Sequence, residues 1–169
     1  MRYKLSLIIC LISLNLSAQA IQNEIDNQVW KPFCRSLMSL DTAKYMLLHD
    51  KELIRVERGN GKIYGYDIYR TNTKSGFEQS SILNKKNAGI KFEVELRFLE
   101  RVATDKIAYE VGYYKSVITF PDGRISKYYS KFHVTLRKAK DKWLLLIDSS
   151  LPMPQLTEDE FMNAKGMHG

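Results

Sequence analysis

Two residues in neighbouring predicted strands, His133 and Asp148, are the clearest candidates for acid–base chemistry. A turn at Lys140-Asp141 would pair them, and a histidine whose tautomer is fixed by a carboxylate can act as a general base. The same row of the sheet would hold Arg97 and Gly112, leaving a notch beside the histidine, with Glu110 and Lys131 nearby. The alternative is a polar network on an exposed or dimer-forming face, where each cross-strand pair contributes only a few tenths of a kcal/mol.

A second group of candidates consists of large amphipathic side chains that could line a pocket. They are Trp30, Tyr45, Tyr66, Tyr109 and Tyr113, with His49 and Asp50 near the pocket rim. Asp50 is an alternative general base. Packing in a core is the commoner use of such aromatic residues, so the tyrosines have a purely structural explanation as well.

The sequence indicates no metal or cofactor. The three histidines, His49, His133 and His168, are scattered without the paired spacing of a zinc site, and neither a glycine-rich phosphate loop nor a Gly-x-Ser-x-Gly elbow occurs. The 26 basic residues give a formal net charge of +7. They are spread among acidic residues, which predicts a solvated mixed-charge surface and no nucleic-acid partner.

The candidate residues depend on a predicted sheet of four antiparallel strands between Lys91 and Ser149. Apolar residues alternate with polar ones, which is typical of strands that bury one face. The predicted apolar face comprises Phe92, Val94, Leu96, Phe98, Ile107, Tyr109, Val111, Tyr113, Tyr128, Phe132, Val134, Leu136, Trp143, Leu145 and Ile147.

Turn residues predict the register of this sheet. Thr104-Asp105 would pair Phe98 with Val111 and Arg97 with Gly112, and Lys140-Asp141 would pair Leu136 with Leu145 and His133 with Asp148. The middle turn, Pro121-Asp122-Gly123, would set Val111 against His133 and so mix the faces. We favour the hydrophobic pattern, which sets Val111 against Val134 and requires a bulge near Ser126–Ser130.

The segments before and after the sheet are predicted to be mainly helical. Residues 21–40 form an amphipathic helix that Pro32 should kink near Gln28, and Asp41 is a good N-cap for a helix from Thr42 to His49. A strand over Glu52–Glu57, a helical segment from Ile63 to Tyr69 and a broken helix or loop from Arg70 to Gly89 follow. Thr157 and Glu160 form a capping box for a short, loosely attached terminal helix.

The first residues resemble a secretory signal peptide. Arg2 and Lys4 precede an apolar run, and Ala18-Gln19-Ala20 is a small-x-small cleavage site. We therefore expect a signal peptide at 1–20, one domain at 21–150, a tail with a short helix at 151–169, and a secreted or periplasmic protein without a membrane anchor after cleavage. Cys34 is the one cysteine of the mature chain and should be buried and inert.

The order of elements resembles the nuclear transport factor 2-like superfamily, and within it secreted bacterial proteins with SnoaL-like or cyclase-like domains. The resemblance covers residues 23–150 and rests on short matches: Val29-Trp30-Lys31-Pro32-Phe33, Leu40-Asp41, Leu47-Leu48-His49-Asp50, Gly65 with Asp67-Ile68, Ala108-x-Glu110-x-Gly112-Tyr113, Lys131-Phe132-His133-Val134, and Lys142-Trp143 before Asp148. It implies a cone-shaped α+β fold, with a curved antiparallel sheet wrapped round a helix and a pocket at its open end. It also implies a homodimer through the sheet.

Fold alone does not decide the activity, because this superfamily includes isomerases, dehydratases, cyclases and proteins without known chemistry. The site of ketosteroid isomerase, which combines an aspartate base with a tyrosine and a protonated aspartate, is not reproduced, since none of Asp50, Glu52 and Glu57 is embedded in an apolar setting by its neighbours. The leading prediction is a binding domain for a small apolar or amphipathic ligand. The alternatives are an acid–base enzyme that uses His133 with Asp148, or Asp50, and a dimeric interaction module.

Overall fold

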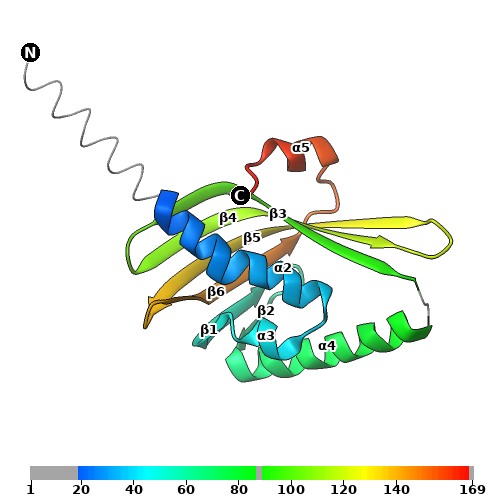
Figure 1. The fold of residues 1–169 in the computed structure, drawn as a ribbon, viewed down its shortest axis with the longest axis horizontal. Helices are drawn as coiled ribbons and strands as arrows, with labels where there is room; N and C mark the ends of the chain where they lie inside the picture. The colour runs from blue at the N-terminus through cyan, green and yellow to red at the C-terminus, as the bar shows by residue number, and fades with distance from the viewer. Residues whose placement is uncertain (1–18, 87–88, 168–169) are drawn as a thin grey trace, which may run out of the picture.

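The computed structural model describes residues 19–86 and 89–167, in which N-terminal helices cover one face of a six-stranded sheet (Figure 1). This is the predicted α+β class. The predicted signal segment falls almost entirely outside the described residues. Within the described part of the chain, no helix is long and apolar enough to cross a membrane.

The N-terminal helix contains one irregular turn. Residues 19–25 are helical, the π-helical turn η1 follows (Asp26–Trp30), and α2 (Lys31–Met38) continues from it. In η1 the backbone N–H of Lys31 bonds to the carbonyl of Asp26, five residues back. The disruption lies where Pro32, near the start of α2, was predicted to cause it, because proline crowds the carbonyl four residues earlier.

The next segments differ from the prediction in three places. Helix α3 (Thr42–Met46) has Asp41 as its N-cap, as predicted, but it ends before His49, which instead begins strand β1 (His49–Glu57). The predicted helical start at Ile63 is a short strand, β2 (Lys62–Gly65). The predicted broken helix is wrong as far as residue 86, because α4 (Tyr66–Lys86) is one continuous helix of 21 residues.

Helix α4 was missed because it buries only a narrow stripe. Tyr69 and Thr73 are buried and Phe77 is half-buried, which gives one contact residue per turn, and the residues between them are polar. The ring of Phe77 packs on Tyr45 of α3 at 5.6 Å between centroids. A stripe this narrow gives little periodic signal, so tertiary packing decides the helix.

The sheet contains the four predicted strands and the two earlier ones. They are β3 (Lys91–Ala103), β4 (Ile107–Thr119), β5 (Ile125–Ala139) and β6 (Lys142–Pro152), in the spatial order β2-β1-β6-β5-β4-β3. Strand β1 runs parallel to β6, and every other pair is antiparallel. Because β1 inserts between β2 and β6, residues early in the chain lie beside the last strand.

The predicted register is wrong between β4 and β5. Val111 pairs with His133, as the middle turn indicates, and the register of these two strands has no shift. The predicted partner, Val134, lies opposite Glu110 instead. The concave face of β4 therefore carries its even-numbered residues, including Ala108 and Gly112, and the odd-numbered tyrosines predicted for the apolar face lie on the other side.

Two bulges shift the register between neighbouring strands. One lies in β3 at Leu99, so Phe98 pairs with Gly112 rather than with Val111, and Arg97 pairs with Tyr113. The other lies in β6 at residue 146, between the pairs Thr135–Ile147 and Leu136–Leu145. The predicted Leu136–Leu145 pair is confirmed. The predicted His133–Asp148 pair is wrong, because His133 lies opposite Ser149.

The core lies between the N-terminal helices and the concave face of the sheet. Trp30, Phe98 and Phe132 are mutually in contact, with ring centroids 5.3–5.7 Å apart. Gly112 does not form the predicted notch. A Cβ at this position would lie 2.2 Å from the Arg97 carbonyl oxygen and 2.5 Å from Cζ of Phe132, so backbone and ring already fill the space.

The C-terminal segment is firmly attached, which corrects the prediction of a loose tail. Thr157 and Glu160 form the predicted capping box of α5 (Glu158–Asn163). Phe161 is fully buried, and Lys165 exchanges two backbone hydrogen bonds with Phe98 on the edge strand β3. Figure 1 shows α5 on the opposite side of the sheet from α3 and α4, so this segment covers part of the convex face.

Candidate functional site

A cavity of about 260 Å³ lies between the helices and the concave face of the sheet. Its walls are mainly apolar and aromatic, with a few polar groups at the side formed by β1 and β6. The lining residues are Trp30, Phe33, Leu37, Tyr45, Arg55, Tyr69, Leu96, Tyr114, Ser130, Phe132, Val134, Leu145, Asp148 and Ser150. Apolar walls with a few convergent polar groups are typical of ligand sites.

An ion pair forms the polar side of the cavity. Arg55 Nη1 donates to Asp148 Oδ1 at 2.9 Å, and Nη2 donates to Ser150 Oγ at 2.6 Å. Burial opposes ionisation of the Asp148 carboxyl, but the nearby Arg55 and His49 side chains together outweigh it, so the pKa of Asp148 lies below its ordinary value of 3.8. The parallel pairing of β1 with β6 sets Arg55 opposite Asp148.

Two buried nitrogens beside Asp148 have no hydrogen-bond partner among the described residues: Arg55 Nε and His49 Nε2. The other ring nitrogen of His49, Nδ1, lies 2.9 Å from the Tyr45 carbonyl, so Nδ1 carries a hydrogen and donates it. His49 Nε2 is 3.9 Å from Asp148 Oδ2, which is beyond hydrogen-bonding distance. Buried polar groups are normally paired, so these two atoms are exceptions at the polar side of the cavity.

Three tyrosines supply hydroxyl groups at the same site. The hydroxyls of Tyr45 and Tyr69 are 2.8 Å apart and buried. Burial and the nearby Asp148 carboxylate raise the pKa of Tyr69 to about 12, and burial raises that of Tyr114 to about 12. Burial likewise holds the pKa of Tyr45 well above its usual value. These hydroxyls remain protonated at neutral pH. Because either Tyr45 or Tyr69 donates its hydrogen to the other, only one of this pair, together with Tyr114, can donate to a ligand oxygen.

The structure brings together part of the predicted site. Trp30, Tyr45 and Asp148 line the cavity, and His49 contacts Tyr45 behind it. Tyr66 lies outside, at the start of α4, where its hydroxyl donates to the carbonyl of Met46. Asp50 is also outside, and the Arg137 guanidinium bonds both of its carboxylate oxygens at 2.8 Å.

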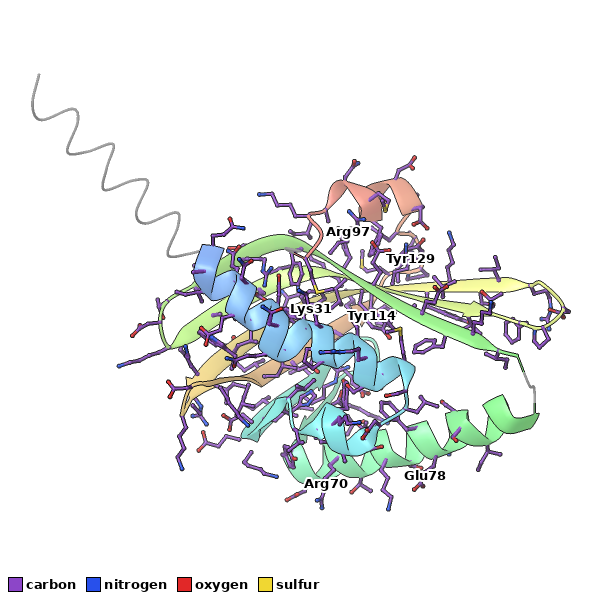
Figure 2. All side chains as sticks on the ribbon, in the orientation of Figure 1. Lys31, Arg70, Glu78, Arg97, Tyr114 and Tyr129 are labelled. Carbon is purple, nitrogen blue, oxygen red and sulfur yellow. The ribbon has the colours of Figure 1, made fainter. Side chains whose placement is uncertain are left out.

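The remaining predicted residues lie on the convex face or in the core. His133 is separated from Asp148, because adjacent positions on a strand point to opposite faces, and its Nδ1 lies 3.1 Å from the Tyr109 hydroxyl. Burial and the nearby Lys131 lower the pKa of His133. Tyr113 pairs with Arg97, whose guanidinium donates to the carbonyls of Met162 and Ala164. Figure 2 shows Arg97 and Tyr129 on the α5 side of the sheet, and Tyr114 between the sheet and the N-terminal helices.

Glu110 belongs to a buried charge cluster that fastens the N-terminal helix to the sheet. Its carboxylate accepts a hydrogen bond from Trp30 Nε1, and Arg101 bonds both Glu110 at 2.8 Å and Asp26 at 2.6 Å. Burial, only partly offset by Arg101, raises the pKa of Glu110. The cluster positions Trp30, which forms one wall of the cavity.

Sequence reasoning missed Arg55, Tyr69 and Tyr114 as pocket residues. One signal was present for Arg55, which shares a face of its short strand with the apolar Leu53. A charged side chain on such a face needs a buried partner, but the sequence does not show that β6 supplies it. Tyr69 was not predicted as a pocket residue because helix α4 was missed. Tyr114 was not predicted because the predicted register of β4 placed it on the wrong face of the sheet.

A second, larger hollow lies beside the cavity. This apolar groove of about 570 Å³ runs between α4, the end of α2 and the ends of β3 and β4. Its lining residues are Leu37, Met38, Leu40, Gly76, Phe77, Ser80, Leu83, Ile90, Phe92, Ile118 and Phe120. Leu37 lines both the cavity and the groove.

No residues that could hold a metal were found in the part of the chain that the structure describes, since it contains no group of three or more histidine, cysteine, aspartate or glutamate side chains with suitable placement. Cys34 is buried, and burial raises the pKa of its thiol to about 12. A thiol with this pKa is a poor nucleophile at neutral pH.

Comparison with known proteins identifies the fold. No family model and no curated protein matches the chain. A solved protein of unknown function from Mycobacterium tuberculosis aligns with a TM-score of 0.60 and 10% identity, covering 81% of this chain and 78% of that one. A ketosteroid isomerase-like protein from Erwinia carotovora aligns with a TM-score of 0.54 and 13% identity, covering 72% and 88%.

An NTF-2 like protein of unknown function from Shewanella oneidensis aligns with a TM-score of 0.53 and 18% identity, covering 75% of this chain and 95% of that one. The chain therefore has the nuclear transport factor 2-like fold, as the sequence resemblance implied. Identities this low define the fold and leave the activity to be argued from the site.

Proposed function

We propose that this protein is a secreted or periplasmic binding domain that holds a small amphipathic ligand in the cavity between its helices and sheet. One observation carries the proposal: an apolar cavity whose polar side has an ion pair, buried tyrosine hydroxyls and a buried Arg55 Nε–H without an acceptor among the described residues. An apolar ligand body would fill the aromatic walls, and one oxygen would bond to the polar side. The signal peptide predicted at 1–20 supports the location.

Acid–base catalysis is less well supported by this geometry. The nearby Arg55 and His49 side chains hold the pKa of Asp148 low, which makes its carboxylate a weak base. His133 lies on the other face of the sheet, and Asp50 is bound by Arg137 outside the cavity. The alternative of a dimeric interaction module is also less well supported. Glu110 bonds to Arg101 inside the core, and Arg97 donates to a carbonyl of the C-terminal segment.

Isothermal titration calorimetry with hexanol, a small uncharged amphiphile, tests the proposal. We expect saturable binding to the wild-type protein. Ser130→Trp should weaken it about tenfold or more, because the indole fills the cavity from its half-buried edge. Lys106→Trp, at an exposed turn, is the matched control and should bind like the wild type. Absence of saturable binding, or equal binding by Ser130→Trp, would contradict the proposal.

A further inference from the structure

The charges around the cavity restrict the kind of polar group that a ligand can place there. Arg55 is already paired with Asp148 at 2.9 Å and bonded to Ser150, so the pair carries no net charge. A ligand carboxylate would lie close to the Asp148 carboxylate without a free cation to balance it, and burying an unpaired charge is costly. An uncharged oxygen has no such cost and can accept from a tyrosine hydroxyl at the cavity wall.

The sizes of the two hollows restrict the ligand body. The inner cavity, at about 260 Å³, is smaller than the roughly 300–1,000 Å³ of most ligand sites. It therefore suits a small group rather than a whole ring system. The groove adjoins it at Leu37 and contributes about 570 Å³. Nine of its eleven lining residues have apolar side chains, and the other two are glycine and serine.

We propose that the ligand is a single-chain amphiphile with an uncharged oxygen head, such as a long-chain alcohol or ketone. The head accepts from a tyrosine hydroxyl, and the chain passes Leu37 into the groove between α4 and the sheet. This inference rests on the proposed function and adds the class of ligand. The two hollows meet at Leu37, and a linear chain fits such a junction better than a broad, rigid molecule.

Isothermal titration calorimetry with decanol, hexanol and decanoate tests the inference. Each buried methylene strengthens binding about fourfold. Decanol should bind at least about tenfold more tightly than hexanol, and also more tightly than decanoate. If hexanol binds and decanol binds no more tightly, the chain does not enter the groove and the inference fails while the proposed function stands. If neither alcohol binds, both fail.

Two adjacent substitutions on α4 test whether the alkyl chain of the ligand lies in the groove. Ser80 lines the groove and is half-buried, and Gln79 beside it is exposed. Ser80→Trp should fill the groove and reduce the affinity for decanol to that for hexanol, without changing hexanol binding. Gln79→Trp should leave both affinities as in the wild type. Unchanged decanol binding by Ser80→Trp would overturn the groove assignment.

The head group is tested on the wild type by the ratio of decanol to decanoate affinity, and then on Asp148→Asn. Removing the carboxylate leaves Arg55 free to pair with an anion. The preference should therefore reverse, with decanoate binding at least about tenfold more tightly than decanol. Tighter binding of decanoate to the wild type would overturn the uncharged head, and this comparison does not depend on whether the variant folds.

Discussion

At the scale of single residues, Asp148 has the most definite role. It is buried, it pairs with Arg55, and it faces the cavity although the predicted alternation placed it with His133. A bulge at residue 146 reverses the faces of β6 after Leu145, which brings the aspartate inside. His133, the partner that the sequence favoured for Asp148, therefore lies on the convex face. The observed partner is Arg55, from β1.

Asp148→Asn is expected to lower the free energy of unfolding at neutral pH by about 3–5 kcal/mol, because it leaves a buried arginine uncompensated. The folded-state pKa of Asp148 is depressed, so its contribution is present above the ordinary value of 3.8 and is lost as pH falls through the lower folded value. Urea unfolding of both proteins across this range measures the difference.

The difference in unfolding free energy between the two proteins should shrink as the solution is acidified. Asp105→Asn, at an exposed turn, is the control and should change stability by less than about 0.5 kcal/mol at any pH. An Asp148→Asn penalty that stays constant down to the lowest pH would show that the ion pair is not its source.

At the scale of elements, hydrophobic patterning predicted that four long strands and two N-terminal helices exist. It did not predict their register, because each bulge adds one residue and reverses every side chain beyond it. The bulge at Leu99 coincides with a break in the alternation, where the apolar Phe98 and Leu99 are adjacent, but such a break does not by itself identify a bulge. Helix α4 was not predicted for another reason: the stripe of buried residues along it is only one residue wide.

Two glycine-to-alanine substitutions distinguish a position where close packing requires glycine from one where glycine only adds freedom to the unfolded backbone. Gly112→Ala should destabilise the protein by about 1–3 kcal/mol or more, because its Cβ would meet the Arg97 carbonyl at 2.2 Å. Gly76→Ala, inside α4 with nothing within 4 Å, should stabilise it by about 0.5–1 kcal/mol. Thermal unfolding measures both, and a tolerated Gly112→Ala would contradict the observed β3–β4 register.

At the scale of the whole molecule, the C-terminal segment covers part of the convex face of the sheet. Lys115 and Lys127 bond to Glu158 at 2.8 Å, and the Lys115 hydrogen bond is the largest influence that lowers the pKa of Glu158 to about 2. The homodimer through the sheet stays a prediction. A partner that used this face would meet α5 as well as the part that carries Tyr109 and His133.

Phe161→Ala is expected to cost about 3–5 kcal/mol of unfolding free energy, because the ring is fully buried against Tyr129 and Lys115. Met162→Ala, at the next and half-exposed position, should change it by less than about 0.5 kcal/mol. Denaturant unfolding compares the two. Equal, small effects would mean that the tail is as loosely attached as the sequence suggested.

Nuclear magnetic resonance of the isotopically labelled protein, titrated with hexanol, determines whether the cavity binds an uncharged oxygen at its polar side. The Arg55 Nε–H resonance should shift saturably, together with the backbone amides of Val134 and Leu145, while those of Tyr109 and His133 remain in place. Shifts confined to the convex face, or an Arg55 resonance that does not respond, would contradict the account.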